Sequence, residues 1–301
     1  MRKGSTYASL AALVLAFVGC APSDQGLGQE SEDQRSGATL PLREVSGLAV
    51  KGQRFVAVGD RSSTVVTFRL AGGAPADVRA HAPLPKAGRK GSQYEAVSFD
   101  GAGNVVVLSE RGELFTLSAD LEREEASSQL DWDSASERLG ARLDDNSLGE
   151  GLVVLEGGHV LVALEKNPSA IVEFGPSGEA ATGYAPGSVS TNAVSLPPTL
   201  VALAAWKIED RHAPDVSELT VGPDGALWAL SQQAKTLVRF ERVLRPDESR
   251  ASVKEHVALP SQFEGAEGLA FDGSRPVVAR DRSATSKSNL YVLDPIATER
   301  E

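Results

Sequence analysis

Five short apolar segments of the sequence each begin with an acidic residue. These acids are Glu44, Glu95, Glu150, Asp215 and Glu267. If a repeated fold makes their positions equivalent, the carboxylates converge on one axis, where they must be protonated, paired with cations or bound to a metal ion. Oxygen ligands alone favour Ca²⁺, which accepts about 6 to 8 of them in irregular geometry. The sequence therefore predicts an acidic calcium site, with an ion-paired ring that uses Arg43, Lys166 or Arg280 as the alternative.

Three further acids end the second strand of a repeat: Asp60, Glu110 and Glu165. We expect their side chains to face the opposite mouth of a central channel and to form a second acidic rim there. Acids at strand ends are also commonly solvated or paired with basic side chains, so a purely structural role is the alternative.

The elements that must position these acids form a repeat of an acid, an apolar strand, a glycine turn and two further strands. The turn glycines include Gly52, Gly103, Gly157, Gly225 and Gly273, where a hairpin needs the positive φ that glycine adopts readily. The pattern recurs five times, at steps of about 50 residues or more, and a period of that length made only of strands is typical of a β-propeller. The predicted fold is all-β, a five-bladed β-propeller.

A fourth strand that closes with Leu-Pro is visible in two repeats, at residues 78–85 and 253–260, and the same pair stands at Leu40-Pro41. Because only eight residues follow Leu293, we expect residues 38–42 to supply the outer strand of the last blade. Such pairing closes the ring and removes two open sheet edges. Chance Leu-Pro matches are the alternative. An insertion at residues 198–214 is apolar enough to be either a lid over a channel mouth or an elongated pair of strands.

The first twenty residues have the order of a secretory leader. Arg2 and Lys3 precede an apolar run that is too short to span a bilayer as a helix. Cys20, the only cysteine, follows a segment similar to the lipobox of bacterial lipoproteins. We therefore expect a signal peptide over 1–19, a lipid on Cys20, a flexible polar tether over 20–37 and the propeller over 38–301. An ordinary signal peptide with a bystander cysteine is the alternative.

The best-defined motifs lie in the third, fourth and fifth repeats. They are Asn146 to Leu152, Glu165-Lys166-Asn167-Pro168, Asp215 to Leu219 and Glu267 to Asp272. In these the sequence resembles the SdiA-regulated family, five-bladed propellers distantly similar to NHL-repeat proteins and esterase-like phytases. The resemblance implies a calcium ion bound to the propeller and no firmly assigned activity.

Charge and motif content exclude several functions. The formal net charge of −11 repels nucleic acid, so no nucleic-acid partner is expected. The four histidines are scattered, and the sequence has neither a Gly-x-Ser-x-Gly elbow nor a phosphate-binding loop. Asp131-Trp132-Asp133 resembles the start of an EF-hand loop, but the later ligand and glycine positions do not match.

Two functions of different class fit the sequence. The first is a monomeric, calcium-binding interaction module, lipid-anchored at the cell envelope, most plausibly at the outer membrane, with a protein, glycan or small-molecule partner. The second is a metal-dependent hydrolase of lactones or phosphoesters, in which calcium polarises a substrate oxygen. No residue stands out as the base that a hydrolase needs, so the interaction module is the preferred prediction.

Overall fold

The computed structural model describes residues 37–84, 93–143, 148–281 and 288–296. The chain divides into two units, Met1–Gln34 and Arg35–Glu301, and all of the described residues belong to the second unit. Cys20 and the predicted leader lie outside the described residues. Within the described ranges, no helix is long and apolar enough to cross a membrane.

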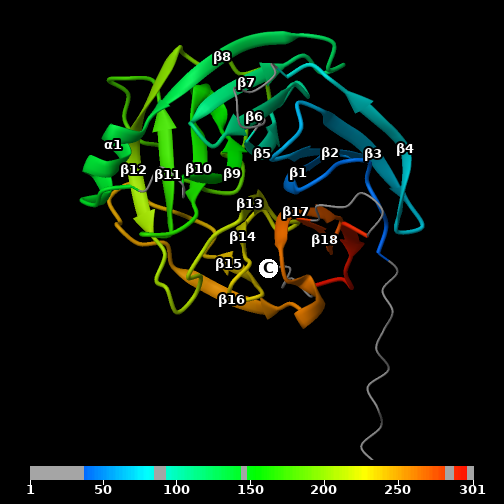
Figure 1. Cartoon of the computed structure of the whole chain (residues 1–301). Coiled ribbons are helices and arrows are strands. Elements are labelled where there is room, and N and C mark those ends of the chain that lie inside the picture. The colour runs from blue at the N-terminus through cyan, green and yellow to red at the C-terminus, as the bar shows by residue number, and fades with distance from the viewer. Residues whose placement is uncertain (1–36, 85–92, 144–147, 282–287, 297–301) are drawn as a thin grey trace, which may run out of the picture. The chain divides into compact units, whose positions relative to one another are not determined.

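The described strands follow one another in five antiparallel runs (Figure 1). The first run is β1 (Val45–Lys51), β2 (Arg54–Gly59), β3 (Val65–Ala71) and β4 (Ala74–His81). The second is β5 (Tyr94–Phe99), β6 (Val105–Ser109), β7 (Glu113–Leu117) and β8 (Glu124–Asp131). The third is β9 (Gly149–Val154), β10 (Val160–Leu164), β11 (Ala170–Gly175) and β12 (Thr199–Lys207). The fourth is β13 (Glu218–Val221), β14 (Leu227–Ser231), β15 (Thr236–Phe240) and β16 (Val253–Ala258), and the fifth is β17 (Ala266–Asp272), β18 (Arg275–Arg280) and β19 (Leu290–Val292).

The second and third runs share one sheet. β8 and β12 pair in parallel, with Thr199 opposite Gln129, and this joins eight strands in a row. The apolar insertion is therefore a strand, β12, at the outer edge of the third run. Helix α1 (Trp132–Leu139) links the two runs, and Asp131 caps it by accepting hydrogen bonds from the backbone of Asp133 and Ser134. This N-cap accounts for the acid-rich Asp131-Trp132-Asp133 motif.

The first strands of the five runs, β1, β5, β9, β13 and β17, lie next to one another around a centre and are called the inner strands below (Figure 1). β1 contacts β5 and β17, β9 contacts β5 and β13, and β13 contacts β17. The inner strands β9 and β13 approach each other closely, because a Cβ atom added to Gly151 would lie only 2.3 Å from the Leu219 nitrogen. Sheets arranged in this way form a β-propeller.

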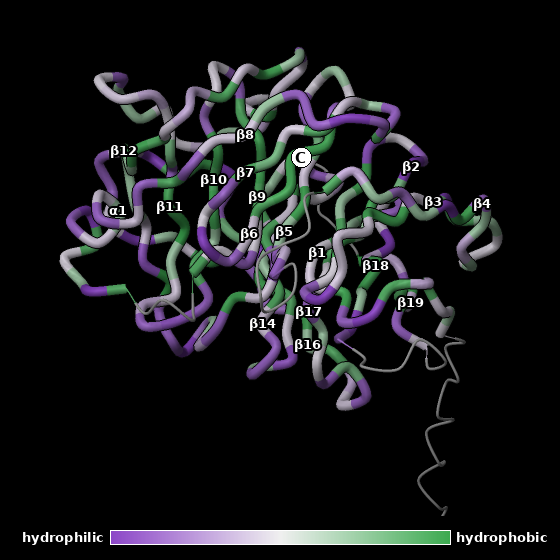
Figure 2. Tube along the Cα trace, turned by 45° about the horizontal axis from the view of Figure 1, so that its top comes forward, coloured by the Kyte–Doolittle hydropathy of each residue, from purple (hydrophilic) through white to green (hydrophobic). Residues whose placement is uncertain are grey.

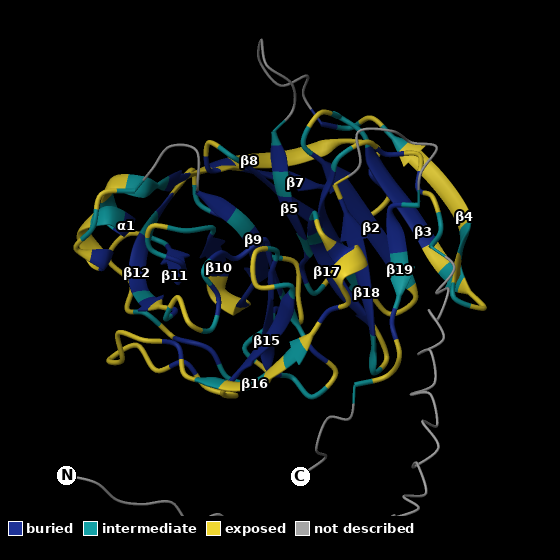
Figure 3. Ribbon diagram, turned by 60° about the horizontal axis from the view of Figure 1, so that its bottom comes forward, coloured by how far each residue is buried: buried dark blue, intermediate teal, exposed yellow. Residues whose placement is uncertain are grey.

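The apolar side chains lie between adjacent sheets. The second strands are buried along nearly their whole length, as in Val105–Ser109 and Val160–Leu164, because both of their faces are covered. Figure 2 shows the corresponding hydrophobic colour along the strands, with hydrophilic residues in the turns. Exposed residues collect on the outer strands β4, β8 and β16 (Figure 3). The core thus consists of the packed faces of neighbouring sheets.

The segment before β1 contacts the last run. Ala38 forms an antiparallel bridge with Leu290, and its nitrogen donates to the Leu290 carbonyl at 2.8 Å. The Asn289 side chain, which is fully buried, accepts from the Leu40 nitrogen at 2.7 Å and donates to the Leu42 carbonyl at 3.0 Å. Ala38, Leu40 and Leu42 therefore contact Asn289 and Leu290, at the start of β19, through one isolated bridge and side-chain hydrogen bonds.

Candidate functional site

Three of the five predicted axial acids occupy the same place in their runs. Glu95, Glu150 and Glu267 each stand in a β-bulge near the beginning of an inner strand, where the register with the second strand slips by one residue. A bulge leaves its extra residue out of the ladder and changes the direction of the side chain. The repeat therefore presents these three carboxylates in equivalent positions.

The other two predicted acids are not equivalent to these three. The bulge positions of the first and fourth runs are held by Ser46 and Ser217, and the acids stand two residues earlier. Glu44 lies before β1, with its carboxylate 2.8 Å from the Arg61 Nε. Asp215 is buried and accepts hydrogen bonds from the Ser231 hydroxyl and the Gln233 nitrogen. Glu44 and Asp215 therefore do not occupy the place of the three bulge glutamates, because in each acid-Val-Ser segment the acid stands two residues before the bulge position.

The second acidic set lies at the same end as the first, not at the opposite mouth. In an antiparallel pair the end of one strand lies beside the beginning of its neighbour. Val45 pairs with Gly59, and Tyr94 pairs with Ser109. The predicted second rim therefore merges with the bulge glutamates, and the fifth run adds Asp281. We call the merged set the acidic cluster: Asp60, Glu95, Glu110, Glu150, Glu165, Glu267 and Asp281.

The three bulge glutamates of the acidic cluster, which are partly buried, have a raised pKa. Burial, followed by the charges of Asp60, Glu110 and Glu165, raises the pKa of Glu95 to about 8. Burial and the charges of Asp281 and Glu95 raise the pKa of Glu267 to about 8. Burial and the same ring of charges raise the pKa of Glu150 well above its usual value. At neutral pH Glu95 and Glu267 therefore hold protons unless a cation replaces them.

Two basic side chains among the described residues lie beside the acidic cluster. The Lys166 Nζ lies 2.5 Å from the Glu165 Oε1, and that hydrogen bond raises the pKa of Lys166. The Nε of the exposed Arg61 lies 3.6 Å from the Asp60 Oδ2. Arg280 donates instead to the Glu264 carbonyl and stacks over Tyr291. Of the cations proposed for an ion-paired ring, Lys166 pairs with the cluster and Arg280 does not.

A glutamate that the sequence patterns did not single out lies between the inner strands. Glu218 is buried and accepts hydrogen bonds from the backbone nitrogens of Leu48 and Leu219, both at 3.0 Å, and from that of Leu269. These donors belong to β1, β13 and β17. At the equivalent position the other runs carry only small residues: Gly47, Ala96, Gly151 and Gly268. Glu218 thus joins three inner strands one residue beyond the bulge layer.

The described carboxylates of the acidic cluster stand too far apart to chelate a metal ion in their present positions. Among the described residues, no three His, Cys, Asp or Glu side chains stand close enough together to hold a metal ion. The donor set nevertheless consists of carboxylates, the chemistry that Ca²⁺ prefers. The cluster therefore fits such an ion by donor type, and the side chains must move towards one another to bind it.

The fold and the site together define a class of protein: a β-propeller with partly buried glutamates at one end of its inner strands. The chain belongs to the SdiA-regulated family, whose model matches residues 39–277. The family prediction from the sequence is thereby confirmed. No curated protein matches the chain.

Several solved structures are similar to the chain at low identity. The glutaminyl cyclase of Myxococcus xanthus has 12% identity and a TM-score of 0.49, with 86% of this chain and 94% of that chain covered. A gluconolactonase of Xanthomonas campestris has 13% identity and a TM-score of 0.46, with coverages of 86% and 88%. The Cps50 β-propeller domain of Myceliophteria thermophila has 11% identity and a TM-score of 0.40, with 82% of each chain covered.

Proposed function

We propose that the domain is an interaction module whose acidic cluster binds Ca²⁺. The observation that supports this most is the convergence of Glu95, Glu150 and Glu267, three partly buried carboxyl groups whose pKa is raised by burial and by neighbouring carboxylates. An uncompensated group of this kind costs stability, and a divalent cation removes the repulsion without protonation. The bound cation would fix the inner strands and the rim that faces a partner.

Calcium-dependent stability tests this function. A ligand that binds only the folded domain stabilises it by about 2.7 kcal/mol at a hundredfold excess over its dissociation constant. We expect the melting temperature at pH 7.5 to be higher with Ca²⁺ than with a chelator, and Glu150→Gln to remove most of the difference. Glu122→Gln, on the exposed turn before β8, is the matched control. Equal melting in both conditions, without calcium in the purified protein, would exclude the calcium site.

We also propose that the five runs are five blades and that residues 38–42 close the ring. The bridge from Ala38 to Leu290 and the hydrogen bonds of Asn289 support this arrangement. Asn289→Ala leaves the Leu40 nitrogen without its buried acceptor, so it should lower the free energy of unfolding by about 1 to 3 kcal/mol. An unchanged urea midpoint would show that the ring is closed elsewhere.

A hydrolase is the second candidate function. Glu95 and Glu267, with pKa values near 8, hold protons at neutral pH and could act as general acids towards a leaving group. Bound calcium would add a Lewis acid that polarises the substrate oxygen. Lactone and phosphomonoester hydrolysis by the wild type, lost in Glu95→Gln but kept in Glu122→Gln, would establish this function. Absence of turnover would favour the interaction module.

The setting of the domain is a further part of the proposal. We propose that the chain is a monomer attached to the cell envelope through a lipid on Cys20, in the outer membrane where the cell has one, and that it presents the propeller to a protein, glycan or small-molecule partner. The lipobox-like sequence before Cys20 supports the anchor. Mass spectrometry of the mature protein should find a diacylated Cys20 as the first residue. An unmodified Cys20 would exclude the anchor.

A further inference from the structure

The outer face of the first run carries a groove with arginine side chains. Its volume is about 300 Å³, and β2, β3, β4 and the turn before β2 line it. The residues used below are Arg54, Thr67, Phe68, Arg69, Asp77 and Arg79. Three of these six side chains are guanidinium groups and one is a carboxylate. In a chain with a formal charge of −11, this is a local concentration of positive charge.

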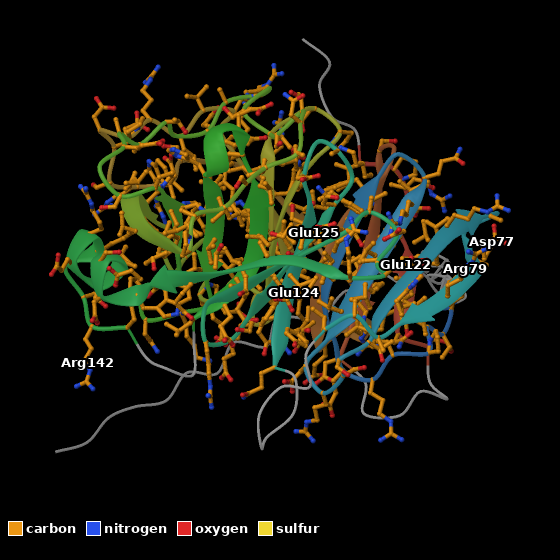
Figure 4. The ribbon with its side chains drawn as sticks, turned by 90° about the horizontal axis from the view of Figure 1, so that it is seen from above. Asp77, Arg79, Glu122, Glu124, Glu125 and Arg142 are labelled. Carbon is orange, nitrogen blue, oxygen red and sulfur yellow. The ribbon has the colours of Figure 1, made fainter. Side chains whose placement is uncertain are left out.

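The three arginines differ in how far they are already paired. Arg69 forms an ion pair with Asp77, so their charges cancel. Arg54 donates to the Ala119 carbonyl at 2.6 Å and lies over the Phe99 ring at 5.7 Å. The backbone of Arg79 pairs with Thr67 in the sheet, but its side chain is exposed and makes no hydrogen bond or ion pair with the part of the chain that the structure describes. Figure 4 shows Arg79 and Asp77 on β4 at the surface of the domain. Arg79 is therefore available to a ligand.

A histidine lies beside the same two arginines. The Thr67 hydroxyl oxygen lies 3.1 Å from the His81 Nε2. Burial, and then the charges of Arg54 and Arg79, lower the pKa of His81. The charges of Arg54 and Arg79 thus both act on the His81 ring, and this ring lies beside the Thr67 hydroxyl that lines the groove. Asp120 also acts on Arg54, but its carboxylate already accepts hydrogen bonds from the Ser118 hydroxyl and the Glu122 nitrogen.

We propose that this groove binds the phosphate group of a small phosphorylated molecule. Guanidinium groups recognise phosphate through paired N–H donors, and the Thr67 hydroxyl offers a further polar contact. A phosphate monoester carries about −1.5 to −2 charges at pH 7, so it gains more from two arginines than a carboxylate does. The volume of about 300 Å³ lies at the lower end for ligand pockets, which limits the ligand to a few carbons beyond the phosphate.

Titration of the domain with glycerol 3-phosphate tests the proposal, with glycerol as the neutral control. We expect saturable binding of glycerol 3-phosphate, no binding of glycerol, and a loss of affinity as salt is added. Arg79→Gln should weaken binding about tenfold or more, since it removes a charged donor. Arg142→Gln, another exposed arginine (Figure 4), should bind like the wild type. Both substitutions leave the melting temperature unchanged, because both side chains are exposed.

Two results would overturn the proposal. One is equal affinity in Arg79→Gln and Arg142→Gln, which would place any phosphate binding outside the groove. The other is binding to phosphatidylglycerol vesicles without binding of glycerol 3-phosphate, which would identify the arginines as a contact to a lipid surface. Retained binding of glycerol 3-phosphate in the presence of a calcium chelator would separate this groove from the acidic cluster.

Discussion

Two sets of buried glutamates in this domain differ in what surrounds their carboxylates. Glu173, in β11, is fully buried and accepts hydrogen bonds from the Thr182 nitrogen and hydroxyl and from the Gly183 nitrogen, each at 2.8 Å. His159 adds a contact of 2.7 Å. The bulge glutamates of the acidic cluster have mainly other carboxylates around them.

This difference distinguishes Glu173, a glutamate with a structural role, from the bulge glutamates of the candidate binding site. A buried carboxylate with several donors is compensated in the folded state, and the network fixes the segment that supplies the donors. Here it ties the turn at Thr182 and Gly183 to β11, while His159 also reaches Glu179 at 3.0 Å. Acids that face one another lack this compensation, so they respond to protons or cations. The following predictions test whether the two sets behave in these opposite ways.

The largest effect is expected at the compensated glutamate. Glu173→Ala leaves the Thr182 and Gly183 donors without acceptors and removes the buried partner of His159. Breaking such a buried charged network should lower the free energy of unfolding by about 3 to 5 kcal/mol, measured by urea denaturation. Glu179→Gln is the control, because Glu179 is 53% exposed and should cost less than about 1 kcal/mol. Equal losses in the two variants would contradict the structural role of Glu173.

A somewhat smaller loss is expected at Glu218. Glu218→Ala deprives the Leu48, Leu219 and Leu269 nitrogens of their acceptor between the inner strands. Buried donors left unsatisfied cost about 1 to 3 kcal/mol, so the urea midpoint should fall clearly. Glu218→Gln keeps one acceptor oxygen and should recover part of the loss. If Glu218→Ala is as stable as the wild type, solvent or a rearrangement of the inner strands must satisfy these donors.

The sequence predicts the strands far better than it predicts the site. The turn glycines Gly103 and Gly157 stand shortly before the second strands β6 and β10, as the repeat predicts, because apolar runs bounded by glycine turns identify strands buried on both faces. The Leu-Pro signal found only two of the outer strands. It missed β8 and β12, because β8 is largely exposed and β12 lies inside an insertion.

The site depends on register, which a single sequence does not fix to one residue. Asp215 and Glu218 stand three residues apart, and the acid pattern selected Asp215, whereas Glu218 is the residue that reaches between the inner strands. The alignment of Ser217 with Glu150 is visible only in the strand pairing, where Glu218 and Gly151 occupy matching places. His159 and Glu173 belong to different strands, and no local motif links them. Pairing of distant strands brings such residues together.

The acidic cluster should make stability depend on pH in the direction opposite to ordinary acid denaturation. Because the pKa values of Glu95 and Glu267 are raised to about 8, the folded domain retains protons that the unfolded chain releases above its own pKa. Stability from these groups is therefore fully present in acid and is lost as pH rises towards about 8, by at most about 1.4 kcal/mol per pH unit for each group. Melts in chelator should show this fall, and Ca²⁺ should oppose it most at the highest pH. A chelator profile that rises steadily to pH 8.5 would exclude the raised pKa values.

A last variant isolates one member of the cluster. Glu267→Gln removes a carboxyl group that burial and the charges of Asp281 and Glu95 keep protonated at neutral pH, and glutamine has nearly the same shape. At pH 8.5 in chelator the variant should be more stable than the wild type, by up to about 1.4 kcal/mol for each pH unit between the ordinary pKa of a glutamate and about 8, because it has no charge to bury beside its neighbours. At pH 5, close to that ordinary pKa, the difference should be small. His159 also titrates with a raised pKa, through hydrogen bonds to Glu179 and Glu173 that outweigh the opposing effect of burial, but it is common to both proteins and cancels in the comparison. A variant that is less stable than the wild type at pH 8.5 would show that Glu267, like Glu173, is compensated by donors, and the contrast between the two sets would then fail at this residue.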